Sequence, residues 1–143
     1  MHSYRIILAA ATVGGILALS ASRPLGVSRE PAPRTVEVQM IGDATGYRFS
    51  PKSITIKRGD RVKWTLVSGP PHNVVFWPDS IPAGAATKLA GSMPQSMGPL
   101  TGPFLMTPGQ SFVIGFDKVP AGTYRYYCAP HLALGMTAAV KVQ

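Results

Sequence analysis

The segment that decides both the fold and the chemistry of this chain reads Tyr124-Arg-Tyr-Tyr-Cys128-Ala-Pro-His131-Leu-Ala-Leu-Gly-Met136. Its first half alternates as a β-strand does, which places the tyrosines two and four positions before Cys128 on the same face as its thiol. Its second half is short and brings an imidazole and a thioether back toward that thiol. Cys128 is the only cysteine, so it forms no disulfide within the chain. A thiolate, an imidazole and a thioether together suit a soft transition metal.

A second histidine completes the set of candidate ligands. His72 follows Gly-Pro-Pro and precedes the short apolar run 73–77, whereas His2 lies in the predicted leader and is not counted. Two imidazoles and a thiolate in a trigonal set, with a weak axial thioether, are the ligands of a blue-copper electron-transfer site. The sequence therefore predicts one metal site formed by His72, Cys128, His131 and Met136.

These four residue types also occur in structural positions, zinc sites and enzyme active sites. Taken singly, the cysteine and the methionine fit a buried core, and each histidine fits an ordinary structural position. A structural zinc site favours several thiolates and imidazoles and has little use for a thioether, so the set favours copper. A cysteine hydrolase is disfavoured because Cys128 and His131 are only three residues apart and no oxyanion loop is evident. A multicopper centre needs further histidine clusters, so we expect one mononuclear site and no enzyme.

Outside these motifs the pattern is that of an all-β domain. The 143 residues include 15 Gly and 14 Pro, and 45% are hydrophobic and 14% charged, which favours short strands joined by turns. Residues 78–109 have no clear period and are predicted to be mainly loop, with room for one helical turn near 83–90. Strands are expected at residues 35–41, 47–49, 53–57, 61–67, 73–77, 110–116, 123–128 and 136–142.

The first 34 residues differ from the rest. Residues 1–22 hold a basic residue, an apolar run and a small-residue end, which predicts a secretory signal peptide, or an anchor if it stays uncleaved. The run is short for an anchor, because a spanning helix needs about 20 apolar residues. Residues 23–34 contain Pro and Arg without a hydrophobic period and are predicted to be a linker, so the folded domain is expected at 35–143. We therefore expect an exported, periplasmic protein.

The charge pattern limits the partners. The formal net charge is +8, and the basic residues are spread over most segments without a dense run, so nucleic-acid binding is not expected. A neutral or acidic partner surface fits such a chain better than a basic one.

Two motifs resemble those of the plastocyanin-like cupredoxins. Residues 69–76, Gly-Pro-Pro-His-Asn-Val-Val-Phe, and 81–84, Ile-Pro-Ala-Gly, are similar to the region of the first ligand, and residues 122–136 are similar to the ligand loop, with the same spacing. The resemblance covers about residue 35 to the end. It implies an eight-stranded Greek-key β-sandwich with one type 1 copper ion, in which His72, Cys128 and His131 are strong equatorial ligands and Met136 a weak axial one. It also implies a monomer that passes single electrons between redox proteins such as a cytochrome, a photosystem or an oxidase.

The resemblance implies roles for residues around the metal as well. Asn73 is expected to hydrogen-bond to the end of the strand that carries Cys128. His131 is expected near the surface as the exit for electrons, inside an apolar rim, and Tyr127 matches the tyrosine of a second, more distant docking route. The candidates for the rim are Pro71, Leu132, Ala133 and Leu134.

Three departures from the family pattern leave the biological setting open. The acidic runs of plant-type members are absent, because residues 77–80 read Trp-Pro-Asp-Ser and residues 92–106 lack the acidic helical stretch. The ligand loop is also more apolar than the Gly-rich common form, through Leu132 and Leu134. A periplasmic respiratory chain therefore fits as well as a photosynthetic one in a thylakoid lumen. The alternative function is a copper carrier or storage protein, in which Met93, Met97 and Met106 would form a second Cu(I) site.

Overall fold

The computed structural model describes residues 32–143. The predicted signal peptide and residues 23–31 of the predicted linker lie outside the described residues. Among the described residues, none of the helices has the length and apolar character needed to cross a membrane. Arg34, at the end of the predicted linker, is already bonded to the fold, since its carbonyl accepts a hydrogen bond from the Arg61 N–H at 2.7 Å.

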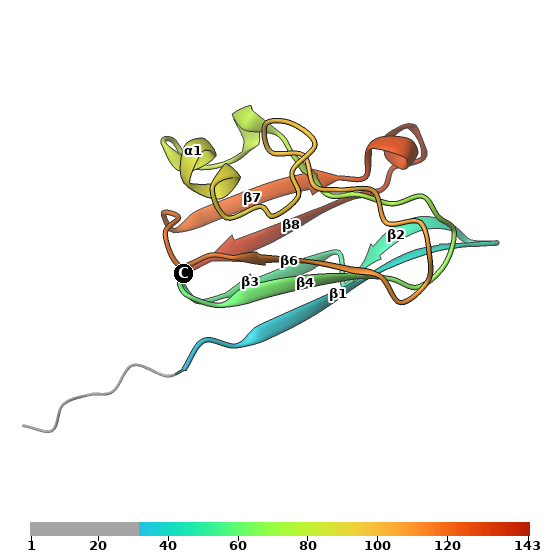
Figure 1. The fold of residues 1–143 in the computed structure, drawn as a ribbon, viewed down its shortest axis with the longest axis horizontal. Coiled ribbons are helices and arrows are strands. Elements are labelled where there is room, and N and C mark those ends of the chain that lie inside the picture. Colours follow the sequence, from blue (N-terminus) through green and yellow to red (C-terminus); the bar gives the residue numbers. More distant parts are fainter. Residues whose placement is uncertain (1–31) are drawn as a thin grey trace, which may run out of the picture. The chain divides into compact units, whose positions relative to one another are not determined.

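Within residues 32–143, eight strands form two four-stranded sheets that pack face to face (Figure 1). The first sheet has the order β2-β1-β4-β6 and the second the order β3-β8-β7-β5. Two of the pairs, β1 with β4 and β3 with β8, are parallel, and the other pairs within the sheets are antiparallel. The strands are β1 (Thr35–Asp43), β2 (Gly46–Ser50), β3 (Ser53–Ile56), β4 (Arg61–Leu66), β5 (Val75–Phe76), β6 (Ser111–Gly115), β7 (Gly122–Tyr127) and β8 (Thr137–Val142). The predicted all-β sandwich is confirmed.

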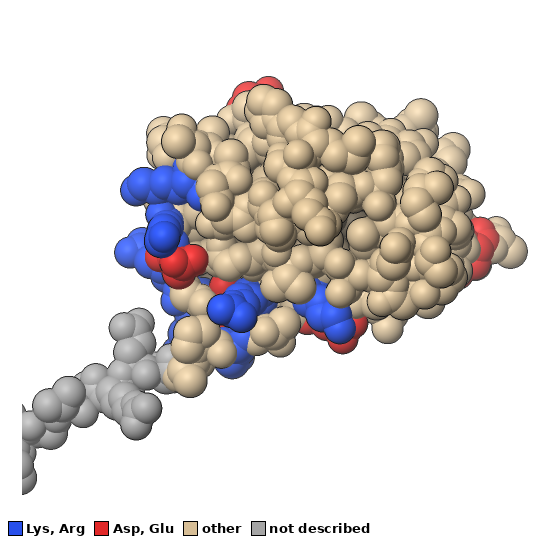
Figure 2. Space-filling model, viewed as in Figure 1, with Lys and Arg blue, Asp and Glu red and all other residues tan. Residues whose placement is uncertain are grey.

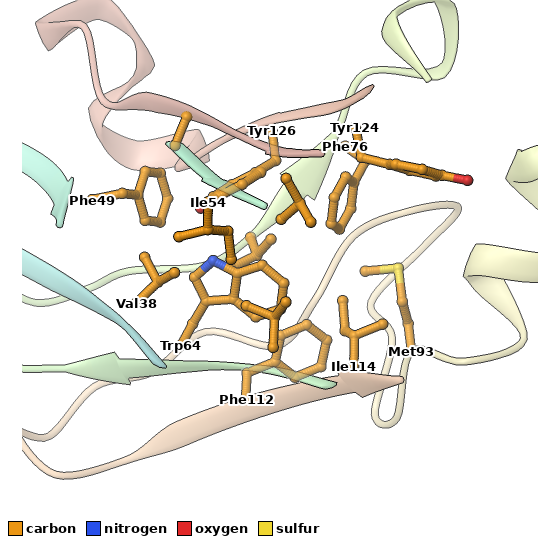
Figure 3. Packing of buried hydrophobic residues seen from close by; sticks show 14 of the residues in the cluster. Val38, Phe49, Ile54, Trp64, Phe76, Met93, Phe112, Ile114, Tyr124 and Tyr126 are labelled. Carbon is orange, nitrogen blue, oxygen red and sulfur yellow. The ribbon is translucent and has the colours of Figure 1, made fainter. Parts of the chain in front are cut away.

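The alternation of apolar and polar residues in the sequence corresponds to an alternation of buried and exposed side chains in the strands. In β4 every second side chain is buried, and the same holds in β3 and β8. Trp64 lies at the centre of the space between the sheets, with Phe112 on one side and Phe76 and Tyr126 on the other (Figure 3). Its ring centroid is 5.4 Å from that of Tyr126 and 6.2 Å from that of Phe112. Aromatic side chains each bury 150–250 Å², or about 4–6 kcal/mol at 25 cal/mol per Å², so this cluster is a main source of the stability.

The long segment 78–109 is mostly loop, as expected, with a 3₁₀ turn η1 (Pro78–Ser80) and one short helix α1 (Ala85–Ala90). It is ordered because its second half runs antiparallel to the chain that carries His72. The backbone N–H and C=O of His72 both bond to Leu105, at 3.0 and 2.7 Å, and Gly102 N–H donates to the Val74 carbonyl at 2.8 Å. The loop thus covers the edge of β5 and fixes the position of His72.

Candidate metal centre

Three of the four predicted ligands meet in one buried place. The ligand atoms of His72, Cys128 and His131 all lie within 4.8 Å of one another. The Cys128 Sγ is 3.5 Å from Nδ1 of His72 and 3.5 Å from Nδ1 of His131. All three side chains are buried, with His131 retaining 7% exposure. An ion held about 2.0–2.3 Å from each nitrogen and sulfur, as first-row metals are, fits between such donors.

The ligand loop is a tight turn whose geometry follows from its spacing. It consists of the 3₁₀ segment η2 (Ala129–Leu134), which begins directly after Cys128. The His131 N–H donates to the Cys128 carbonyl at 3.1 Å. This i to i+3 bond closes a single turn between the two ligands, although Cys128 is extended and His131 has a non-helical backbone, and the Cys128 Sγ lies 3.5 Å from Nδ1 of His131. Cys128 is extended, and Ala129 is the first residue of the turn.

Met136 is joined to the other two ligands of this loop through the backbone. Its carbonyl accepts the Cys128 N–H at 3.1 Å, and its N–H donates to the His131 carbonyl at 3.2 Å. Gly135, with φ of +81°, ends η2 in the left-handed conformation and turns the chain into β8. The Met136 side chain is fully buried. The loop therefore closes on itself with its thioether residue beside its thiol residue.

The hydrogen bond of His72 selects its metal-binding nitrogen. Nε2 of His72 lies 2.9 Å from the Ser68 carbonyl oxygen. A carbonyl oxygen only accepts, so Nε2 carries the proton and donates it. In a neutral imidazole the other nitrogen, Nδ1, then has a free lone pair, and it faces the Cys128 sulfur. The backbone thus presets the tautomer in which Nδ1 can bind a metal.

The electrostatics of the donor set fit a cation. Burial lowers the pKa of His72, although its bond to Ser68 acts in the opposite direction. Burial and then the neighbouring His72 lower the pKa of His131. Burial also raises the pKa of the Cys128 thiol, partly offset by the backbone amides of Asn73 and His131. Neutral imidazoles are ready to coordinate, while a buried thiolate needs a positive ion beside it.

Asn73 makes the expected bridge to the ligand loop. Its side-chain Oδ1 accepts a hydrogen bond from the Ala129 N–H at 2.8 Å, and the residue is buried. The bridge joins two segments 56 residues apart, directly beside His72 on one side and Cys128 on the other. Such supporting bonds orient metal ligands.

Tyr47 is a residue of the site that the sequence did not single out. Its ring stacks on the His131 imidazole with centroids 3.7 Å apart and planes 12° apart, and it meets His72 edge-on at 6.1 Å. The sequence placed Tyr47 only in a short strand. No local pattern marks the contact, because it depends on the pairing of β1 with β2 and on a loop more than 80 residues away.

The surroundings of His131 are apolar, as expected. Leu132 and Leu134 are exposed by 39% and 62%. Two further exposed apolar residues, which the sequence did not indicate, lie on the loops that flank His72: Val67 follows β4, and Met106 follows Leu105. We define the apolar rim as Val67, Pro71, Met106, Leu132, Ala133 and Leu134.

Tyr127 lies on the outer face of its sheet, opposite to Cys128, as predicted. It is half-buried because its ring packs against Trp77, with centroids 4.5 Å apart. The Arg125 guanidinium lies 5.9 Å from the centre of the Trp77 ring. The face around Tyr127 is therefore aromatic and cationic rather than acidic.

The methionines of the alternative function do not share one environment. Met93 belongs to the hydrophobic core, whereas Met97 and Met106 are exposed on loops. A buried thioether in an apolar core packs as an ordinary hydrophobic side chain.

A two-sheet β-sandwich with a buried cysteine and two histidines converging at its end is the arrangement of a cupredoxin. The model of the copper binding proteins of the plastocyanin/azurin family matches residues 36–143, and the chain belongs to this family. The predicted resemblance and copper as the cofactor are thereby confirmed.

Individual relatives agree with this assignment. The chain is 37% identical to plastocyanin of Scenedesmus fuscus over 108 residues, which covers 76% of this chain and 99% of that protein. It is 34% identical to a plastocyanin of Synechococcus sp. over 138 residues, covering 96% of this chain and 90% of that one. Among solved structures, it is similar to oxidised plastocyanin of Dryopteris crassirhizoma, with a TM-score of 0.55 and 34% identity. The match covers 76% of this chain and 100% of that one. Pseudoazurin of Methylobacterium extorquens AM1 matches with a TM-score of 0.52 and 32% identity, over 76% of this chain and 74% of that one.

Proposed function

We propose that this blue copper protein is an exported carrier of single electrons between two redox proteins, with His72, Cys128 and His131 as equatorial ligands and Met136 as the axial ligand. The observation that carries the proposal is the convergence of one buried sulfur and two Nδ1 atoms at 3.5 Å. The family consists of copper-binding proteins. Its plastocyanin-like members are electron carriers rather than enzymes, which agrees with the expectation for this chain.

The residues of the site supply a rigid, dry environment for electron transfer. Bound copper supplies the one-electron step between Cu(II) and Cu(I). The Ser68 carbonyl holds His72, and Asn73 holds the start of the ligand loop. Burial of all four side chains excludes water. A site whose ligands do not move between oxidation states loses little energy to reorganisation, which is what a carrier needs.

Electrons are proposed to leave through His131. It is the candidate ligand with the largest remaining exposure, 7%, and it lies inside the apolar rim. Every residue of the rim is uncharged. An uncharged rim suits a partner with a neutral contact surface, and the net charge of +8 tolerates acidic groups around that surface. Tyr127, adjacent to Cys128, is proposed as a second route, reached from the cationic face of Arg125 and Trp77.

Export and a periplasmic location are part of the proposal. They rest on the signal-like pattern of residues 1–22. Some relatives carry the name "plastocyanin, chloroplastic", and a lumenal location is the corresponding alternative. Fractionation of expressing cells with mass spectrometry of the mature N-terminus tests both the location and cleavage after residue 22. The donor and the acceptor are proposed to be redox proteins, and the chain is proposed to act as a monomer.

Titration of the metal-free protein with copper tests the function. One Cu(II) per chain should produce an intense visible thiolate-to-copper absorption and a reversible reduction potential. The Cys128→Ser variant should bind without this band, because the thiolate is lost. A band that persists in Cys128→Ser contradicts the ligand assignment.

The copper carrier or storage function predicts a different result of the same titration. It requires a colourless protein that binds several Cu(I) ions through Met93, Met97 and Met106. We expect the stoichiometry to stay at one when exposed Met97 and Met106 are both changed to Leu. A fall in stoichiometry in that double variant would favour the storage function.

A further inference from the structure

The three rings at the metal end form a packed unit rather than separate contacts. The His131 imidazole is nearly parallel to the Tyr47 ring, at 3.7 Å and 12°. His72 meets His131 at 4.8 Å with an interplanar angle of 59°, and it presents an edge to Tyr47 at 6.1 Å. A parallel ring at this distance is in van der Waals contact over its whole face. Rotation of His131 about its Cβ–Cγ bond would therefore collide with Tyr47.

Tyr47 reaches His131 because the residue opposite to it is a glycine. Gly42 and Tyr47 are direct partners in the antiparallel β1–β2 pair. A Cβ added to Gly42 would lie 2.5 Å from Cε1 and 2.7 Å from Cδ1 of the Tyr47 ring. Any larger side chain at position 42 would displace the ring. The ring therefore lies across its cross-strand neighbour and extends to the imidazole.

The same glycine is tied to the other imidazole. The Gly42 N–H donates to the Ser68 carbonyl at 3.0 Å, and the Ser68 hydroxyl donates to the Gly42 carbonyl at 3.0 Å. This Ser68 carbonyl is also the acceptor for Nε2 of His72. Gly69, with φ of +71°, packs so close that a Cβ on it would lie 2.6 Å from the Gly42 Cα. The β1–β2 hairpin thus supports both imidazoles: Tyr47 stacks on His131, and Gly42 bonds to Ser68, whose carbonyl holds His72.

We propose that Gly42 and Tyr47 form a brace that holds the imidazoles of His131 and His72 in their metal-binding orientations before copper binds and in both oxidation states. Tyr47 acts on His131 through ring stacking, and Gly42 acts on His72 through Ser68. Tyr47 is a positioning residue and makes no bond to the metal. The inference rests on the proposed function for the identity of the two ligands, and it adds the element that presets their geometry.

The first measurement follows the His131 ring without metal. In the metal-free protein the stacked Tyr47 ring should shift the His131 ring-proton resonances upfield in NMR spectra. Tyr47→Leu should remove that shift, whereas Tyr47→Phe should keep it, because the stack needs the ring and not the hydroxyl. Unchanged His131 resonances in Tyr47→Leu would overturn the proposal.

The second measurement follows the copper-loaded protein. Tyr47→Leu should release copper roughly tenfold faster to a chelator, in the range found when support of a ligand is lost, and its visible band should broaden. Tyr47→Phe should match the wild type. Equal impairment of Tyr47→Phe and Tyr47→Leu would assign the effect to the hydroxyl and overturn the proposal. A wild-type protein that forms no blue site would instead refute the proposed function, and the metal-free NMR result would still decide the brace.

Gly42→Ala keeps the proposal testable if Tyr47→Leu fails to fold. The added methyl group should displace the Tyr47 ring, so the upfield shift of His131 should fall although Tyr47 is still present. Gly98→Ala is its control, because an added Cβ on Gly98 would meet nothing closer than the Thr101 hydroxyl at 4.0 Å. Equal His131 spectra in Gly42→Ala and the wild type would contradict the brace.

Discussion

Asn73 lies next to one candidate ligand in the sequence but supports the segment that carries the others. Its Oδ1 is the acceptor for the Ala129 N–H, the first donor after Cys128. Asn73 is buried and the bond itself is partly buried, so the loss of the acceptor would leave the Ala129 N–H without this partner. A single side chain therefore couples the loop of His72 to the loop of His131.

Asn73→Ala should weaken the metal site more than the fold. We expect copper affinity to fall about 10-fold or more, because supporting bonds of metal ligands have effects of this size. The free energy of unfolding of the metal-free protein should fall by about 1–3 kcal/mol. Competition with a chelator measures the first quantity and urea unfolding the second. Thr45→Ala removes an exposed side-chain bond at the hairpin tip and should leave copper affinity unchanged; an equal loss in both variants would argue against a specific role of Asn73.

The turn between β3 and β4 is the element that attaches the beginning of the described chain. Asp60 is buried there and accepts hydrogen bonds from the backbone N–H groups of Arg34 and Lys57, at 2.8 and 2.9 Å, and from the Arg34 guanidinium at 3.1 Å. Burial alone would raise the pKa of Asp60, but these bonds outweigh it and hold the pKa below the usual value of 3.8. The carboxylate is thus a link between β1 and the β3–β4 turn.

Asp60→Asn should lower stability at neutral pH and change its dependence on acid. Because the pKa of Asp60 is lower in the folded than in the unfolded state, its contribution is complete above the unfolded value and is lost as pH falls through the folded value. We expect a loss of about 2 kcal/mol at pH 7 and a smaller difference from wild type below pH 3.8. Thermal unfolding across pH measures this. Asp117→Asn, at an exposed position, should change stability little at any pH, and a pH-independent loss in Asp60→Asn would refute the linkage.

At the scale of the whole molecule, most of the visible basic residues lie away from the metal end. Lysine and arginine gather at the end where residue 32 enters the fold, whereas the opposite end shows an acidic patch and no basic residue in this view (Figure 2). Backbone bonds place Arg34, Arg58 and Arg61 at the charged end, beside the C-terminal Gln143. Interactions between exposed charges are screened over about 10 Å at 0.1 M salt. The basic residues therefore act weakly on a partner at the rim.

Electron exchange with small ions should depend on where a charge lies and not on net charge alone. We expect Leu134→Glu, in the rim, to slow oxidation of the reduced protein by hexacyanoferrate(III) by roughly tenfold. Lys57→Gln, at the opposite end, changes the net charge by one unit as Leu134→Glu does, and it should alter the rate by less than about twofold at 0.1 M salt. Stopped-flow absorbance of the blue band measures both rates. Equal effects of the two substitutions would contradict an exit at the rim.

Local chemistry in the sequence was sufficient for the class of fold and for most of the site. Alternation with period two is a property of neighbouring residues, so it predicted the strands and the inward face that carries Trp64 and Tyr126. The three-residue spacing of Cys128 and His131 allows one i to i+3 hydrogen bond, so their closeness could be predicted from the local sequence. The choice of His72 and Met136 as ligands followed from donor chemistry, and that assignment stays a prediction until copper binding is measured.

Only the tertiary structure decided the contacts that depend on strand register and close packing. The stack of Tyr47 on His131 requires the pairing of Gly42 with Tyr47 and the approach of Gly69 to Gly42, which no local pattern encodes. The bond between Arg34 and Asp60 likewise joins residues far apart in the chain. The position of the basic residues away from the apolar rim also depends on how the chain folds. Sequence patterns determine which side chains face inward, because that depends on the strand period. Which of them touch depends on how the sheets and loops pack together.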